Sequence, residues 1–552
     1  MQTRHLLACL AAGVFCFTLA SVSPAEDIDG TDNADTLTGT DGEDEITGLD
    51  GDDIIRALDG NDLVHGGDGA DTIDGGAGDD TLNGNQHNDT IDGGGGNDTI
   101  NTGPGGNVAH GGAGNDTITS AHSWPSSGTD GYPATNTNYP AEGQAEFRLA
   151  DEGILNQAWG GEGNDYLEAK NVLGWQGWGG SFHFLHGGTG ADILEGGGGQ
   201  DLIVIQGNDD TVITGPYEDV VAIVGNSVEG YTFYDALKYL PSGDVEKDEH
   251  GNPIDFNNGT DMICFVRDVN PQQLTMISVF ASGSWKQFME FDTGLPTRDP
   301  VHLDLNEHPM LKNFEAFRTG DGDDTLVGRD YGSPDGPQVP PSYGVRLKGA
   351  FKGPLYQNDP DDLSWLYLHE LFFTGAGNDT VTTGRGNDLV DLGEGNDTVY
   401  LGPDNCFVIT GAGNDTVQLD AAVMNGSDSP NPDGGKIRIA DFAGGDKVVL
   451  TGVTAEQVTF EQTTMPDNKG GALLGQTFTI VKIDGVEQFV LMNRTASDLA
   501  VQNVGGKATL TMKPTRPEEE LATPDDIKGP GKETKGDGDP PRVIRPDGGA
   551  RR

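Results

Sequence analysis

The stretch GGDGADTIDGGAGDDTLN, residues 66–83, contains the pattern that decides the fold of this chain. It holds two nine-residue units, and each has glycines near its start, an aspartate at position six and an aliphatic residue at position eight. The glycines permit tight turns with positive φ, and the polar, aliphatic, polar triplet around position eight indicates a very short strand with one inward side chain. Each unit therefore predicts one turn followed by one short strand.

The same register continues without a gap through ten units, over residues 30–119. It returns in residues 160–168, in four units over 187–222, in a lone unit at 319–327 and in five units over 374–418. Similarity at a fixed short period is typical of a solenoid, in which successive units stack. We therefore expect an all-β fold of stacked segments interrupted by other material.

Such a solenoid lacks a thick hydrophobic core. Hydrophobic residues make up only 34% of the 552 residues, and each unit offers one inward aliphatic side chain. Burying that side chain does not offset the entropy lost when nine residues are ordered, and stacking brings aspartates of neighbouring coils close enough to repel. The bare repeats should not fold without a further source of stability.

A hard divalent cation would supply that stability. Calcium accepts six to eight oxygens from carboxylates and main-chain carbonyls, and its binding energy becomes folding energy. Magnesium demands stricter octahedral geometry, and zinc or copper prefers His or Cys, which the turns largely lack. The net charge of −57 also favours cations as partners and argues against nucleic acid. The sequence therefore predicts Ca²⁺ as the cofactor.

At these residues the chain resembles the secreted RTX proteins, whose hemolysin-type calcium-binding repeats follow the pattern GGxGxDxUx. The resemblance implies a parallel β-roll in which two units make one turn, with calcium between turns on the same side and turn carbonyls completing each site. It implies that the metal ligands are Asp35, Asp44, Asp53, Asp62, Asp71, Asp80, Asp89, Asp98, Asp116, Asp165, Asp192, Asp201, Asp210, Asp219, Asp324, Asp379, Asp388, Asp397 and Asp415. Asn107 and Cys406 stand at position six without a carboxylate, so complete sites are not expected there.

The first 25 residues have the features of a secretory signal peptide. Arg4 precedes an apolar run over residues 6–20, and Ser23 and Ala25 are small residues where signal peptidase reads. We expect cleavage after Ala25; the alternative is a membrane anchor, but the apolar run is short for a span. No other stretch is long and apolar enough, so we expect no membrane span after signal removal. The expected location is secreted, extracellular or at the cell surface.

The remaining sequence divides into alternating repeat and non-repeat segments. The closing segment DFAGGDKVVL resembles the one that follows RTX repeats, and the strands after it should cap the open end of the solenoid. The expected organisation is a signal peptide at 1–25, a β-roll at 26–119, a loop or insertion at 120–159, a second β-roll at 160–222, a β-rich module at 223–318, an isolated repeat at 319–327, an insertion at 328–373, a third β-roll at 374–418, a C-terminal β cap at 419–512 and a disordered tail at 513–552.

No catalytic signature of an enzyme stands out. The His-Glu pair at residues 369–370 is nearest to a zinc-protease helix, but Phe373 stands where the second histidine must be, and no GxSxG nucleophile elbow occurs. Asp304, Glu307 and His308 are interpreted as surface charge, because neighbouring strand residues point to opposite faces. We therefore lean against an enzyme and expect a calcium-binding protein with a structural or adhesive role.

The alternative is a secreted carbohydrate-active enzyme or lectin with its active module at residues 223–318, since glycoside hydrolysis needs only two carboxylates. Eighteen residues, 169–186, separate two repeats and predict two aberrant coils. Their aromatic residues are Trp175, Trp178, Phe182 and Phe184. These side chains suit either a sugar-stacking platform or the filling of a roll that lacks its metals. Extracellular glycans or matrix are accordingly the macromolecular partners considered.

Two cysteines, Cys264 and Cys406, remain after signal removal. An oxidising compartment permits a disulfide between them, and two unlinked thiols are the alternative.

Overall fold

The structure is a computed structural model of the 552-residue chain. It describes residues 25–122, 147–148, 156–171, 182–197, 200–207, 209–215, 219–234, 261–267, 275–281, 284–288, 297–308, 311, 314–329, 345–346, 367–368, 370–403, 406–420, 437–464, 477–492 and 494–513. In this part of the chain the regular structure is nearly all β-strand, with two short 3-10 helices at Ala455–Gln457 and Ala496–Asp498. No described helix is long and apolar enough to cross a membrane.

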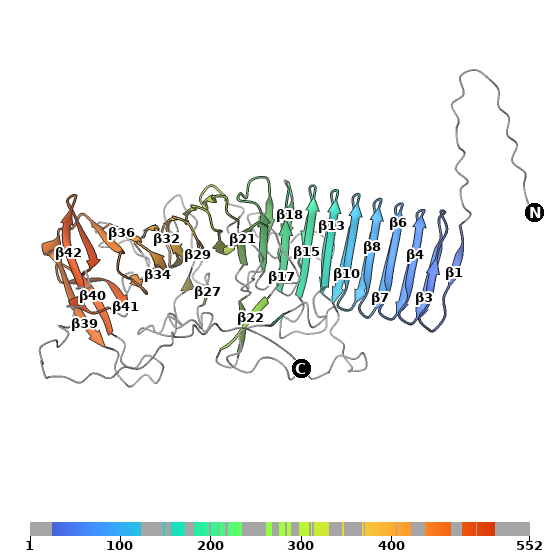
Figure 1. The fold of residues 1–552 in the computed structure, drawn as a ribbon, viewed down its shortest axis with the longest axis horizontal. Helices are drawn as coiled ribbons and strands as arrows, with labels where there is room; N and C mark the ends of the chain where they lie inside the picture. The colour runs from blue at the N-terminus through green and yellow to red at the C-terminus, as the bar shows by residue number, and fades with distance from the viewer. Residues whose placement is uncertain are drawn as a thin grey trace, which may run out of the picture. The chain divides into compact units, whose positions relative to one another are not determined.

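The first part of the solenoid consists of two parallel sheets (Figure 1). The first sheet contains, in order, β1 (Asp27–Asp29), β3 (Glu45–Asp50), β5 (Leu63–Asp68), β7 (Thr81–Gln86), β9 (Thr99–Pro104), β11 (Thr117–His122), β14 (Tyr166–Asn171), β16 (Ile193–Glu195), β18 (Thr211–Ile213) and β20 (Thr232–Tyr234). The second begins with β2 (Thr36–Thr38), β4 (Ile54–Asp59), β6 (Thr72–Ala77), β8 (Thr90–Gly95), β10 (Val108–Ala113), β13 (Asn156–Glu162), β15 (Phe182–Thr189), β17 (Gln200–Ile205), β19 (Val220–Val224) and β21 (Asp261–Val266). Consecutive units therefore alternate between the sheets, and two units make one coil.

The register between coils is eighteen residues in the first roll. Ile73 of β6 pairs with Ile55 of β4 and Ile91 of β8, and all three side chains are fully buried in one core shared by both sheets. After the three-residue strands β1 and β2, the strands of this roll are six residues long, from position seven of one unit to position three of the next. They are longer than the predicted triplet because the glycine at position one, such as Gly75, also points inward.

The second sheet continues toward the C-terminus, and a third sheet replaces the first. The second sheet adds β25 (Phe314–Arg318), β29 (Glu370–Phe373), β31 (Asp388–Asp391), β34 (Cys406–Ile409) and β37 (Ile437–Ile439). The third contains β24 (His302–Asp304), β26 (Thr325–Val327), β30 (Thr380–Thr382), β33 (Thr398–Tyr400), β36 (Thr416–Asp420) and β38 (Lys447–Thr451).

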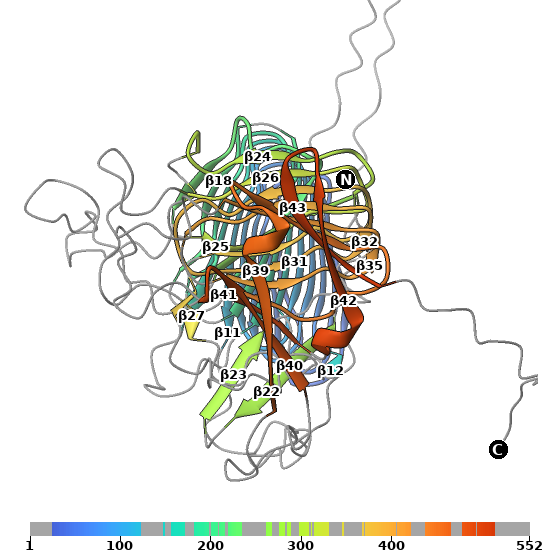
Figure 2. The same ribbon diagram turned by 90° about the vertical axis from the view of Figure 1, so that its left-hand side faces the viewer.

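The strands near the C-terminus lie at the end of the stack. Strand β43 (Lys507–Met512) pairs antiparallel with β38 and with β42 (Leu499–Val504). Strand β41 (Val486–Met492) pairs with β37 and with β40 (Thr477–Ile483), which pairs with β39 (Val458–Thr464). These strands face the viewer in Figure 2. The change from parallel to antiparallel pairing ends the regular repeat of coils.

Small sheets account for the other described strands. One is antiparallel and contains β12 (Phe147–Arg148), β22 (Thr275–Ala281) and β23 (Ser284–Phe288). The others pair β27 (Val345–Arg346) with β28 (Tyr367–Leu368), and β32 (Glu394–Gly395) with β35 (Ala412–Gly413).

The segment 223–318 does not form the separate module that was expected. Its strands β20, β21, β24 and β25 pair into the sheets of the solenoid, and only β22 and β23 stand outside them among its described strands. The chain up to Met512 is one compact unit. The repeat pattern is obscured here because insertions separate the strands that pair.

Insertions also change the boundaries of two other segments. The expected insertion at 120–159 contains the end of β11 and the start of β13, and the aspartates of this coil are 49 residues apart rather than 18, so 31 extra residues enter one coil. In the coil after that, Tyr166 pairs with Ile193, which is 27 residues further along the chain rather than 18. The segment 169–186 therefore supplies one strand unit, β15, and nine added residues, not two aberrant coils.

The expected tail at 513–552 and signal peptide at 1–25 lie almost wholly outside the described residues.

Candidate metal sites

The position-six aspartates lie at the turns and form rows along the solenoid, one coil apart. The row at the strands of the first sheet is Asp44, Asp62, Asp80, Asp98, Asp116, Asp165, Asp192 and Asp210. The row at the strands of the second sheet is Asp35, Asp53, Asp71, Asp89, Asp201, Asp219 and Asp388, and the third sheet carries Asp324, Asp379, Asp397 and Asp415. Most of these side chains are buried, so the structure gathers the predicted residues into lines of buried carboxyl groups.

In most of these aspartates, one carboxylate oxygen accepts a hydrogen bond from the preceding coil. The Oδ1 atom of Asp62 accepts a hydrogen bond from the main-chain N–H of Asp44 at 2.7 Å, and that of Asp80 from Asp62 at 2.8 Å. The same bond recurs along both rows and crosses the insertions, because the N–H of Asp116 donates to Asp165 at 2.8 Å. This ladder fixes the orientation of the carboxylates.

The other oxygen is buried and has no hydrogen-bond partner in the described part of the chain. This holds for Oδ2 of Asp53, Asp62, Asp71, Asp80, Asp89, Asp98, Asp116, Asp165, Asp192, Asp201, Asp210, Asp379, Asp397 and Asp415. Burial raises the pKa of Asp71 to about 6, of Asp80 to about 7 and of Asp89 to about 8, against the lowering effect of the main-chain hydrogen bond. Buried acceptors that lack donors are costly, and a cation is one way to satisfy them.

At several turns with glycine at position one, among them those at Gly48, Gly66 and Gly93, a main-chain carbonyl lies close to this oxygen. A Cβ atom placed on Gly66 would lie 2.4 Å from Oδ2 of Asp71 and 2.8 Å from the carbonyl oxygen of Gly84 on the next coil. Glycine at position one therefore allows a carboxylate and a carbonyl to approach the same point. Positive φ is instead required at positions two and four, where Gly67 has φ 118° and Gly69 has φ 152°. The turn thus places several oxygens together, which is the donor set that calcium prefers.

Asn107 shows what the same turn does with an amide. Its Oδ1 accepts the N–H of Asp89 at 2.7 Å, as an aspartate would. Its Nδ2 donates to the carbonyls of Gly103 at 2.9 Å and Thr102 at 3.3 Å. The amide hydrogens thus find acceptors in two main-chain carbonyls of their own turn.

The repeats match a known family model. Residues 29–64, 65–100, 101–120, 178–212 and 370–405 match the RTX calcium-binding nonapeptide repeat (4 copies). These are RTX repeats. The match confirms the resemblance seen in the sequence, the parallel β-roll and Ca²⁺ as the ion that repeats of this kind bind. No curated protein matches the chain.

The RTX register extends further than the sequence predicted. Asp261 and Asp446 also occupy position six, and their Oδ1 atoms accept the N–H groups of Asp219 at 3.0 Å and Asp415 at 3.1 Å. Both side chains are buried. The available signal was the aliphatic residue two positions later, Ile263 or Val448, which follows each aspartate in FNNGTDMIC and DFAGGDKVV.

A second ladder, which the sequence did not predict, follows position five of the RTX units. The Oδ1 atoms of Asp79 and Asn97 accept main-chain N–H groups one coil on, from Asn97 at 2.7 Å and Asn115 at 2.9 Å. These groups are exposed, unlike the aspartates of position six. The ladder holds adjacent turns in register without metal, and its signal is the frequent Asn or Asp before the position-six aspartate.

Several turns satisfy their carboxylates with protein donors. The hydroxyl groups of Thr31 and Thr40, at position two, donate to Oδ2 of Asp35 at 2.8 Å and of Asp44 at 3.0 Å. The N–H of Gly320 lies 3.3 Å from Oδ2 of Asp324. These three predicted ligands therefore differ from the aspartates with an unpartnered oxygen.

His183 occupies position six in its unit and replaces the aspartate. Its Nδ1 lies 2.8 Å from Oδ1 of Asp201, and both side chains are fully buried. No group of three or more His, Cys, Asp or Glu side chains gathers as a metal site among the described residues. A cation at these turns must therefore use main-chain carbonyls as ligands.

Of the four aromatic residues considered for sugar stacking, the structure describes one side chain, that of Phe184. Phe184 is fully buried in an apolar cluster, as the filling interpretation predicted. Trp175, Trp178 and the side chain of Phe182 lie outside the described residues.

The acidic segment near residue 304 forms a turn. The Oδ1 of Asp304 accepts the N–H of Asn306 at 2.9 Å, and Glu307 is exposed, which fits surface charge. Residue 369 lies outside the described residues. Cys264 and Cys406 are both buried and form no disulfide, and burial raises the pKa of Cys264 to about 12.

Proposed function

We propose that the chain is a secreted calcium-binding protein whose RTX repeats fold when Ca²⁺ enters the turns, and that it has a structural or adhesive role. The observation that carries this proposal is the pair of acceptors at turns such as those of Gly48, Gly66 and Gly93, where a buried carboxylate Oδ2 without a donor lies beside a main-chain carbonyl. Asn107 supports it, because an amide at position six finds main-chain carbonyls within reach as acceptors.

The residues of each turn have distinct roles in this proposal. The position-six aspartates predicted from the sequence, together with Asp261 and Asp446, would hold the ion through carboxylate oxygens. Position-one glycines such as Gly66 would leave room for the adjacent carbonyl of the next coil. When bound, Ca²⁺ supplies the positive charge that removes the repulsion between stacked carboxylates. In the folded turn, the main-chain hydrogen bonds to Oδ1 hold the carboxylates in a fixed orientation.

Secretion and the structural role rest on separate arguments. Residues 1–25 have the pattern of a signal peptide, and proteins with RTX repeats are typically secreted. The carbohydrate-active alternative assumed an independent module at residues 223–318. Most described strands there pair into the solenoid, so we retain the structural or adhesive role.

Calorimetric titration of the chelated full-length protein with Ca²⁺ tests the proposal, and Mg²⁺ at the same concentration is the control. We expect uptake of many calcium ions with a cooperative gain of structure, and little response to magnesium. A protein that takes up no calcium would overturn the proposal. A glycan array tests the alternative, since specific sugar binding would favour a lectin.

A further inference from the structure

We propose that the guanidinium group of Arg329 is a built-in cation, which takes the place of a calcium ion between the coil of β25 and the coil of β29. This joint would then stay folded without metal. The inference rests on the calcium-dependent folding proposed above, because it describes where that dependence is absent.

The turn at Gly328 has the geometry of the aspartate turns. A Cβ atom on Gly328 would lie 2.5 Å from Oε2 of Glu370 and 2.4 Å from the carbonyl oxygen of Thr383. This is the combination found at Gly66, where the carboxylate belongs to Asp71 and the carbonyl to the next coil. Glu370 also pairs with Asp388 in the second sheet, so it occupies position six of its unit. Arg329 follows Gly328 directly. Glu370 comes 41 residues after Arg329 in the chain, because an insertion lies between them.

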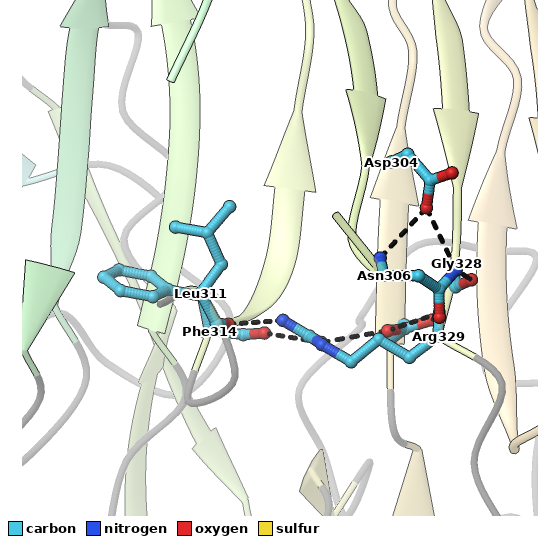
Figure 3. A network of polar contacts seen from close by, with 7 residues as sticks. Asp304, Asn306, Leu311, Phe314, Gly328 and Arg329 are labelled. Atoms are coloured by element: carbon cyan, nitrogen blue, oxygen red, sulfur yellow. Dashed lines mark hydrogen bonds and ion pairs between the residues drawn. The ribbon is translucent and has the colours of Figure 1, made fainter. Parts of the chain in front are cut away.

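Arg329 supplies the donors that the aspartate turns lack. Its Nη1 donates to Oε1 of Glu370 at 2.9 Å, and its main-chain N–H lies 3.1 Å from both carboxylate oxygens. The guanidinium also donates to the carbonyl of Leu311, which precedes β25, and to that of Phe314, the first residue of β25 (Figure 3). One positive group therefore joins a carboxylate on one coil to carbonyls on the coil before it.

Both charges are almost completely removed from water. The Arg329 side chain is 4% exposed and that of Glu370 is fully buried, and the guanidinium lies 5.8 Å from the ring centre of Phe317. Arginine stays charged under all conditions that proteins meet, so its positive charge cannot be lost as a bound ion can. The pair is neutral overall and its donors meet acceptors, which the aspartate turns achieve only with a cation.

Neighbouring turns strengthen the inference, because this part of the solenoid has few position-six carboxylates. Tyr231 and Val301 occupy position six between Asp210 and Asp324, and Phe314 pairs with Asp261 in the second sheet. Arg329 therefore lies beside the interruption at Phe314 in the row of the second sheet, while Asp324 and Asp379 continue the row of the third sheet across the same two coils.

Hydrogen exchange of the full chain, measured by mass spectrometry with calcium and after chelation, tests the proposal. We expect peptides covering β6 and β8 to lose protection on chelation, with exchange at least tenfold faster, while peptides covering β25 and β29 keep theirs. Equal loss in both regions would overturn the built-in cation but leave the proposed function intact. No loss in either region would overturn both.

The double variant Arg329→Gly/Glu370→Asp restores the glycine and aspartate of the RTX pattern. We expect β25 and β29 to become calcium-dependent, protected with calcium and exposed after chelation. Arg56→Gln is the matched control, because Arg56 is an exposed arginine on β4, and its exchange should follow that of the unaltered protein.

If the double variant does not fold, the single variant Glu370→Gln tests whether the Arg329–Glu370 pair stabilises these coils. It leaves the buried guanidinium without its counter-charge, so we expect faster exchange at β25 and β29 both with and without calcium. Unchanged exchange in this variant would contradict the role of the pair.

Discussion

Asn107 and Asp89 stand one coil apart in the same row and differ at the turn by a single side-chain group. The amide of Asn107 donates to two carbonyls, whereas Oδ2 of Asp89 has no donor among the described residues. We expect Asn107→Asp to add one calcium site and to destabilise the chelated protein by about 1–3 kcal/mol, the cost of a buried unsatisfied group. Calcium stoichiometry by titration calorimetry and thermal midpoints by scanning calorimetry check this.

Asp71→Asn is the reverse change at an equivalent turn. Its amide should donate to the nearby carbonyl, so we expect one calcium ion fewer and a higher thermal midpoint in chelator. If both variants bind as many ions as the unaltered protein, the turns are not the binding sites.

The titration of the buried carboxyl groups sets a pH dependence for the metal-free protein. Burial raises the pKa of Asp80 to about 7 and of Asp89 to about 8, well above the usual value of about 3.9 in an unfolded chain. Their contribution to stability is therefore present below about pH 4 and is lost as pH rises toward about 8. In chelator the thermal midpoint should fall over this range.

With saturating calcium the trend should reverse, because the ion binds the deprotonated carboxylate and competes with protons. Scanning calorimetry at several pH values, with calcium and with chelator, measures both trends. Parallel trends in the two series would show that these carboxyl groups do not bind the ion.

At the scale of the turn and its strand, two glycines of the first roll distinguish a glycine required by close packing from one that has free space around it. An added Cβ on Gly66 would meet Oδ2 of Asp71 and the carbonyl of Gly84, while one on Gly95 would meet no atom within 4 Å. We expect Gly66→Ala to cost about 1–3 kcal/mol of unfolding free energy and to weaken calcium binding.

Gly95→Ala is the matched control and should be neutral or slightly stabilising, since it only reduces the freedom of the unfolded chain. Chemical unfolding of both variants in calcium gives the comparison. Equal stability of the two variants would rule out a packed turn at Gly66.

The sequence predicted a coil wherever its two units lie close together along the chain. The eighteen-residue pairing of Ile55, Ile73 and Ile91 follows directly from the nine-residue period. Glu370 and Asp261 were missed as position-six residues because insertions separate them from the turns or strands with which they pair. A search for a continuous nine-residue period cannot find a coil whose two strands are separated in the sequence by an insertion.

At the scale of the whole molecule, the solenoid has apolar residues on both faces of part of its second sheet. Ile203 of β17 joins the inner core, whereas its neighbours Leu202 and Val204 belong to a second cluster with Phe184 and Cys264. The sequence signal is the continuous apolar run LIVI, which is typical of a strand buried on both faces. Reading only position eight overlooked this outer layer, so the core beyond residue 182 is thicker than the repeats indicate.

The central claim is that calcium supplies the stability that the thin first roll lacks. Far-ultraviolet circular dichroism of the full chain, recorded in calcium and again after addition of a chelator, tests it most directly. We predict a large loss of strand signal on chelation and its full return when calcium is restored in excess. An unchanged spectrum in chelator, with the same thermal midpoint as in calcium, would contradict the account.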